Sequence, residues 1–189
     1  MISYDLPKGA VAVGCGYLYA MPVADFKLHE TTWETMTEIG YITEDGATFT
    51  RSAESDPLVT ANYGTIANKR SEYTTEFDTG VISLTKENLS VFSTGAATED
   101  LEDGGYRMNF SEDDTPANVA LCFRCTDLKK GKYFNLYMPN ASWIPELEWT
   151  FNKDDALALN MHFNCNNAVS AEGESIAAYL ETNLGVAKA

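Results

Sequence analysis

Four cysteines and two histidines are the residues best suited to metal or nucleophilic chemistry in this chain of 189 residues. Cys122 and Cys125 form a CFRC pair, and His162 and Cys165 form an HFNC pair. Together the two pairs offer the nitrogen and sulfur ligands of a tetrahedral zinc site. Both pairs fall in predicted strands, however, where residues three apart point to opposite faces. We therefore expect buried thiols in place of a zinc site.

Other patterns of catalysis or ion binding are equally weak. Only His29 and His162 are available as imidazole bases, and the sequence has no G-x-S-x-G elbow and no phosphate-binding glycine loop. The acidic runs TEDLEDGG and SEDD could suggest a calcium loop. Aligning Gly104 with the invariant glycine of an EF-hand puts Leu101 at a ligand position, so that interpretation fails. We expect solvated acidic loops, no enzyme activity and no cofactor.

The composition describes an acidic, strand-rich chain. It has 28 Asp and Glu residues against 13 Lys and Arg, a net charge of −15, and 12% aromatic residues, which favour strands. Proteins that hold nucleic acid gain affinity from Lys and Arg contacts with phosphates, so this charge argues against a DNA-binding surface. The longest uncharged run, residues 9–24, is shorter than the about 20 residues of a membrane span, and Gly and Pro interrupt it. We expect no membrane segment and folding in the cytosol.

Alternation of apolar and polar residues predicts most of the strands. It occurs in YTTEFDT, VALCFRC, YFNLYMP, ELEWTF and ALALNMHFNC, which cover residues 73–79, 119–125, 133–139, 146–151 and 156–165. We expect the second and third segments to pair, and the turn-like NKDD to connect the last two. Each strand is predicted to have one buried apolar face and one solvated polar face.

The stretch GYITEDGATFT, residues 40–50, predicts a tight β-hairpin. With Asp45-Gly46 as the two turn residues, Ile42 faces Phe49 and Thr43 faces Thr48. One face is then apolar and the other polar, as cross-strand pairing requires in a hairpin that buries one side.

Helices and loops fill the remaining chain. Thr85 can cap a short helix that ends near Gly95. Residues 174–185 suggest a second helix or a loose acidic tail, and residues 51–72 and 96–116 are expected to be long loops. We predict one domain over residues 1–189, with 167–189 a C-terminal helix or tail. The fold class is mainly β, an antiparallel β-sandwich or small barrel flanked by one short α-helix and containing a long inter-strand loop.

The order of these features resembles a known family. GYLYAMP is followed by TWETMTEIGYITEDGATFT, the strand EYTTEFDTGVISL, the helix TKENLSVFSTG and the closing block YMPNASWIPELEWTFNKDDALALNMHF. In this order the segments are similar to the major tail tube proteins of long, non-contractile-tailed bacteriophages. The resemblance covers about residues 9–165 and rests on order and spacing, since no single motif is specific.

The resemblance implies a structural virion protein. Such subunits form hexameric rings that stack into the phage tail tube, through which DNA passes without specific binding. The implied partners are further copies of the chain, the tape-measure protein, and the tail terminator and tail-tip proteins. The expected location is the virion tail, assembled in the host cytoplasm.

The resemblance also suggests two sets of site residues. Polar strand faces that carry acidic residues are candidates for lining the tube, and the alternative is that they are simply solvated; these residues are Glu76, Asp78, Glu146 and Glu148. The loop 51–72 mixes apolar residues with two bases and is the candidate for contact between rings. Its residues are Leu58, Val59, Tyr63, Ile66, Lys69 and Arg70.

Two other functions remain open. The chain could be a subunit of another β-fold assembly, such as a secretion tube, a pilus or a capsid decoration. It could instead be a carbohydrate-binding β-sandwich module in which Trp143 or Trp149 stacks on a sugar. Trp149 alternates with Glu146 and Glu148, which favours packing in the core over sugar binding.

Overall fold

The structure is a computed structural model that describes most of the backbone. The described residues are 16–60, 64–82, 98–108, 118–125, 132–149, 159–170 and 172–183. Within these ranges, the side chains of residues 44–45, 54–60, 64–72, 98, 108 and 144–149 lie outside the description. The helix predicted at Thr85 to Gly95 also lies outside the described residues.

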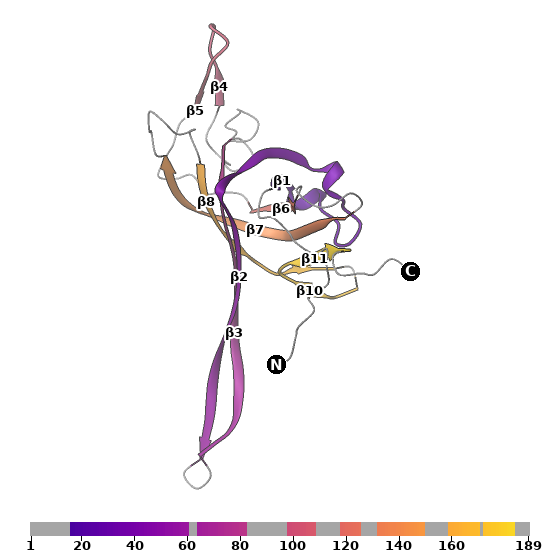
Figure 1. The fold of residues 1–189 in the computed structure, drawn as a ribbon, viewed down its shortest axis with the longest axis vertical. Coiled ribbons are helices and arrows are strands. Elements are labelled where there is room, and N and C mark those ends of the chain that lie inside the picture. Colours follow the sequence, from indigo (N-terminus) through magenta and orange to yellow (C-terminus); the bar gives the residue numbers. More distant parts are fainter. Residues whose placement is uncertain are drawn as a thin grey trace, which may run out of the picture.

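Six antiparallel strands close into a barrel (Figure 1). They are β1 (Gly16–Pro22), β2 (Thr37–Thr60), β3 (Gly64–Val81), β6 (Asn118–Cys125), β7 (Phe134–Trp149) and β8 (Leu159–Cys165). The order around the barrel is β7, β6, β1, β2, β3, β8, and β8 pairs back onto the second half of β7. The predicted mainly β class is confirmed, and of the sandwich and the small barrel the structure has the barrel.

Smaller elements surround the barrel. Strand β11 (Tyr179–Thr182) pairs with the first half of β7. Two small hairpins are β4 (Thr98–Asp100) with β5 (Tyr106–Met108), and β9 (Ala168–Val169) with β10 (Ser175–Ile176). Two 3₁₀ turns are η1 (Val23–Asp25) and η2 (Trp33–Thr35), and the described residues contain no longer helix.

Large apolar side chains fill the interior of the barrel. They come from all six strands and include Leu18, Ile39, Phe77, Leu121, Met138 and Phe163, each nearly or fully buried. Burying each one stabilises the fold by roughly 1.5–3 kcal/mol. The described side chains therefore fill the barrel of one chain as a packed core.

A second apolar cluster lies on the outside of the barrel. Residues 23–36, which we call the cap segment, cross the outer face of β1, β6 and β7, where Tyr19, Cys122 and Tyr137 are buried with Phe26 and Trp33 against them. Both faces of β6 and of the first half of β7 are therefore buried. The prediction of one solvated face per strand is wrong for these two strands, although it is confirmed for β8, where apolar buried residues alternate with polar ones.

The tight hairpin predicted at Asp45-Gly46 is wrong. Ile42 pairs with Val81 and Ala47 with Thr79, so residues 43–46 form an irregularity within one continuous strand. Gly46 has φ = 82°, which a residue without a side chain adopts at little cost. The local sequence favours a turn here, but β3 pairs with the residues of β2 on both sides of it, and this pairing keeps the strand continuous.

Two predicted loops and one predicted helix are also corrected. Residues 51–60 and 64–72 belong to β2 and β3 and pair in an antiparallel ladder, so the predicted long loop is mostly a hairpin. Within the second loop, residues 98–108 form the β4–β5 hairpin. The C-terminal stretch forms β10 and β11 where a helix or tail was expected, because the apolar residues of Tyr179 to Thr182 complete the edge of β7.

Candidate functional site

The outward face of β3 and β8 forms a polar surface, which we call the polar wall. Opposite residues in neighbouring strands share this face, and Thr50 pairs with Glu76, Glu76 with Asn164 and Asn164 with Ser142. A second row contains Thr48, Asp78 and His162. In the strand order around the barrel, β3 and β8 lie across from β1 and β6, which the cap segment covers. The polar wall is thus the open side of the barrel.

Glu76 and Asp78 lie two residues apart on the polar wall. Their side chains are half-buried, and the Asp78 carboxylate is hydrogen-bonded to Nδ1 of His162. Asp78 and His162 retain 46% and 34% of their side-chain exposure. The structure therefore brings together these two predicted acidic residues, and it adds His162, which the sequence offered only as a ligand of the rejected zinc site or as a base.

The charges of the polar wall act on a thiol behind it. Burial raises the pKa of Cys165 to about 12, and the negative charges of Asp78 and Glu76 raise it in the same direction. A thiol with this pKa is almost entirely protonated near neutral pH. Cys165 is therefore an inert core residue.

The other two predicted acidic residues lie near the end of β7. The backbone of Glu148 pairs with Asn160, two residues along β8 from His162 of the polar wall. Glu146 falls within the irregularity between Ile144 and Glu148. The side chains of Glu146 and Glu148 lie outside the description, so the structure brings together only Glu76 and Asp78 of the four.

A cluster of amides continues the polar wall onto β7 and β6. Ser142 Oγ donates to Asn118 Oδ1 at 2.8 Å, Asn118 Nδ2 donates to Asn140 Oδ1 at 2.8 Å, and Asn166 Nδ2 donates to Ser142 Oγ at 2.6 Å. Sequence reasoning missed this cluster because its members come from three separate segments. Only the register of β6, β7 and β8 brings them together.

Beyond the polar wall, β2 and β3 continue as a two-stranded ribbon, which we call the arm (residues 50–60 and 64–75). β1 pairs with β2 only as far as Tyr41, and β8 pairs with β3 only from Glu76 onward. In the described chain the two arm strands therefore pair only with each other. At about 3.3 Å per residue, the arm is roughly 35 Å long, and Figure 1 shows it projecting from the barrel.

The residues predicted for ring-to-ring contact lie in this arm. Leu58 pairs with Ala67, Val59 with Thr65, Lys69 with Asp56 and Arg70 with Ser55, while Ile66 falls at a register shift. Tyr63 lies outside the described residues. The five described positions thus belong to a β ladder with register shifts and not to a loop.

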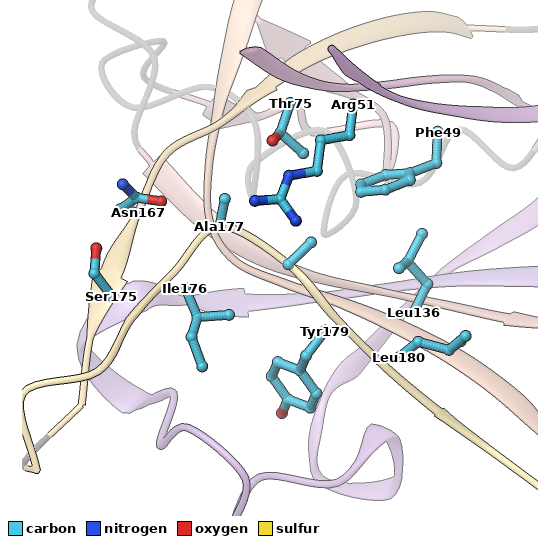
Figure 2. Close-up of a pocket in the computed structure, with 11 residues that line it drawn as sticks. Phe49, Arg51, Thr75, Leu136, Asn167, Ser175, Ile176, Ala177, Tyr179 and Leu180 are labelled. Atoms are coloured by element: carbon cyan, nitrogen blue, oxygen red, sulfur yellow. The ribbon is translucent and has the colours of Figure 1, made fainter. Parts of the chain in front are cut away.

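A cavity of about 380 Å³ lies where the arm leaves the barrel, and we call it the arm-root cavity (Figure 2). It lies between the arm, β7 and the chain around β10 and β11; its described lining residues are Phe49, Arg51, Thr75, Leu136, Asn167 and residues 175–180. Arg51 is the one charged residue among them. Figure 2 shows its guanidinium directed toward the segment that holds Ala177, and its Cζ lies 5.2 Å from the ring centroid of Tyr73.

A second cavity, of about 640 Å³, lies between the cap segment and residues 167–172. Lys27 and Glu30 line it and form an ion pair with each other at 3.9 Å. Both side chains remain 74% exposed, so this pair contributes little to stability.

The described residues do not assemble the zinc site that the sequence could suggest. Cys122 lies in the cluster outside the barrel and Cys165 lies in the core inside it. Burial raises the pKa of Cys122 to about 12. Within the described part of the chain, no group of three His, Cys, Asp or Glu side chains could hold a metal ion.

The two tryptophans of the possible sugar site differ in what the structure describes. Trp143 packs against the core cluster inside the barrel, which leaves its ring poorly placed to stack on a sugar. The side chain of Trp149 lies outside the description.

Among the described residues, no helix has the length and apolar character that crossing a bilayer requires.

Comparison of the chain with protein-family models and with curated protein sequences gives no match.

Proposed function

We propose that the chain is a structural subunit of a phage tail tube, in which hexameric rings stack around a channel for DNA. The observation that supports this most is the arm. It projects from a closed barrel, and its two outer edges have no strand partner in the described chain. The proposal otherwise depends on the resemblance of the sequence to tail tube proteins.

The arm is a physical liability in an isolated chain. A two-stranded ribbon is marginally stable alone, and unpaired edges are templates for association with other chains. Both problems disappear when neighbouring copies cover the arm. Residues Leu58, Val59, Ile66, Lys69 and Arg70 of the arm, with Tyr63, are then the proposed contacts between successive rings.

A channel in such an assembly would have to lie between copies, because side chains fill the barrel of each chain. The polar wall is the proposed lining, with Glu76 and Asp78 facing the channel. Six copies of a chain with net charge −15 give −90 per ring. A negative channel disfavours contacts with phosphates, so DNA would slide through it without sticking.

The remaining partners of the proposed tube follow from the resemblance. They are the tape-measure protein within the tube, and the tail terminator and tail-tip proteins at its ends. The subunit would act in the virion tail after assembly in the host cytoplasm, as a structural component and not as an enzyme.

Removing the arm tests the proposal. Residues 54–72 would be replaced by Asn-Gly, because Ala53 pairs with Tyr73 and a two-residue turn can join such a pair. We expect a folded monomer, with thermal unfolding close to that of the parent, that forms no rings or tubes under negative-stain electron microscopy. Tubes of normal appearance from the shortened chain would reject the role of the arm.

The second candidate function is a subunit of another β-fold assembly, which would use the same arm for contacts between copies. The parent chain distinguishes the two under the same microscope. Rings that stack into long tubes favour the tail tube, whereas closed rings that do not stack favour the other assembly.

A further inference from the structure

The β4–β5 hairpin, residues 98–108, concentrates negative charge at a short turn; we call it the acidic hairpin. Glu99, Asp100, Glu102 and Asp103 are all exposed, and Leu101 between them is partly exposed. Backbone hydrogen bonds from Leu101 to Gly105 and from Gly104 to Leu101 hold the turn. Arg107 pairs with Glu99 at 3.2 Å, and Glu102 at the turn keeps an exposed carboxylate.

The arm-root cavity has the complementary character. Its lining is apolar apart from Arg51 and a few uncharged polar groups, and it leaves large apolar side chains in contact with solvent. Phe49 is 38% exposed and Leu180 is 49% exposed, and Tyr73 beside Arg51 is 53% exposed. A basic group over such a surface suits a ligand that combines a carboxylate with an apolar side chain.

The two features lie far apart in one copy. Figure 1 shows the acidic hairpin at one end of the long axis, and the arm extending to the other end. They can meet when copies stack in the same orientation and the arm of one copy lies alongside the barrel of the next, which brings its arm root to the acidic hairpin of that copy. Contacts of this head-to-tail kind use two different surfaces, and they generate open filaments when the rotation between copies does not close a ring.

We propose that the acidic hairpin of one copy docks in the arm-root cavity of the next copy along the tube. The carboxylate of Glu102 pairs with Arg51, and Leu101 packs against the apolar lining near Phe49. Each chain has a net charge of −15, so stacked copies repel unless acidic groups meet basic ones at the contact. The inference rests on the proposed tube and names the partner surface within it.

A charge-reversal cycle tests the contact. Arg51→Glu and Glu102→Arg are made singly and together, and the critical concentration for tube formation is measured by sedimentation. We expect each single change to raise it about tenfold or more, and the double variant to return to within about threefold of the parent. Lys27→Glu and Glu30→Arg provide the matched control, because they make the same two charge changes at an ion pair on the cap segment.

Cross-linking gives a second measurement that does not depend on the strength of assembly. Glu102→Cys and Ala177→Cys are combined in one chain, and assembled tubes are treated with a thiol oxidant. We expect a ladder of disulfide-linked multimers on a non-reducing gel, because each copy is joined to the next. Glu102→Cys combined with Glu34→Cys, and each single variant, should give no ladder.

The outcomes separate this inference from the proposed function. If the parent chain forms no rings or tubes, the proposed function fails and this contact fails with it. If the parent forms tubes, but the charge effects are only additive and no ladder forms, the contact is wrong and the tube remains. Docking of the hairpin on a neighbour within the same ring would give closed cross-linked hexamers, which would also overturn the head-to-tail contact.

Discussion

Asp78 and His162 lie opposite each other on β3 and β8, and their side chains are hydrogen-bonded across the polar wall. At the scale of single residues, several described polar groups tie strands together in this way. The amide cluster of Asn118, Ser142 and Asn166 does the same between β6, β7 and the chain after β8. Such contacts fix the register of the barrel and leave Glu76 available as a carboxylate on its surface.

Two of the three described buried thiols predict how stability depends on alkaline pH. Burial raises the pKa of Cys122 and Cys165 to about 12, whereas both ionise near pH 9 when the chain is unfolded. Their contribution is therefore complete below about pH 9 and is lost as pH rises toward 12, by up to about 1.4 kcal/mol per unit for each thiol. Urea unfolding between pH 8 and 11 measures this loss. Cys122→Ala should give a shallower decline above pH 9, and an unchanged slope would contradict the assignment.

Gly16 shows how closely two strands can approach. A Cβ at this position would lie 2.2 Å from the backbone oxygen of Arg124 and 2.8 Å from Cε2 of Phe123. We expect Gly16→Ala to lower the free energy of unfolding by about 2 kcal/mol or more, because backbone atoms of β6 must move. Gly105→Ala is the control, since its nearest neighbour is a side-chain oxygen of Asp103 at 3.1 Å. Chemical denaturation of both variants checks the difference, which should exceed about 1 kcal/mol.

At the scale of elements, strand pairing overrides the local turn signal. The sequence around Asp45-Gly46 has the composition and the alternation of a tight hairpin. In the structure Phe49 pairs with Phe77, because β3 is long enough to pair with β2 from Ile42 to Thr60. The strands at β3, β6, β7 and β8 were predictable, since their alternation is strong. The outer cluster was not, because the cap segment that buries it shows no periodic pattern.

Deleting residues 44–46 tests this correction. Ile42 pairs with Val81 and Ala47 with Thr79, so the deletion would join Thr43 to Ala47 opposite Gly80 and Thr79 without changing which residues face the core. We expect a folded barrel whose stability changes by about 1 kcal/mol or less, since register is kept. Circular dichroism and thermal unfolding measure this. Loss of the fold would instead support a turn at Asp45-Gly46.

At the scale of the whole molecule, four features lie apart from one another. The barrel core is filled, the polar wall lies on the side away from the cap segment, and the arm and the acidic hairpin extend from opposite ends (Figure 1). A molecule of this shape presents different surfaces at its two ends and on its two sides. Stacked rings around a central channel, as proposed above, would use all four.

Labelling of the polar wall tests its place in the proposed tube. Glu76→Cys should react with a bulky maleimide polymer in the monomer, because this position is partly exposed. In assembled tubes we expect the reaction to be strongly suppressed, since the polymer cannot enter the channel. Glu34→Cys on the cap segment is the control and should react in both forms. Equal labelling of Glu76→Cys in tubes and monomers would place the polar wall on the outside.

By itself the sequence determined the mainly β class, the apolar and polar faces of β3 and β8, the acidic charge and the pairing of β6 with β7. These follow from local alternation and composition, which state what each face of a segment prefers. Only the tertiary structure decided that β2 continues past Asp45-Gly46 with an irregularity, that hairpins occupy most of one predicted loop and part of the other, and that the last strands replace a helix or tail. Alternation specifies which face must be buried, but the partner that buries it comes from a distant part of the chain, and only packing selects it.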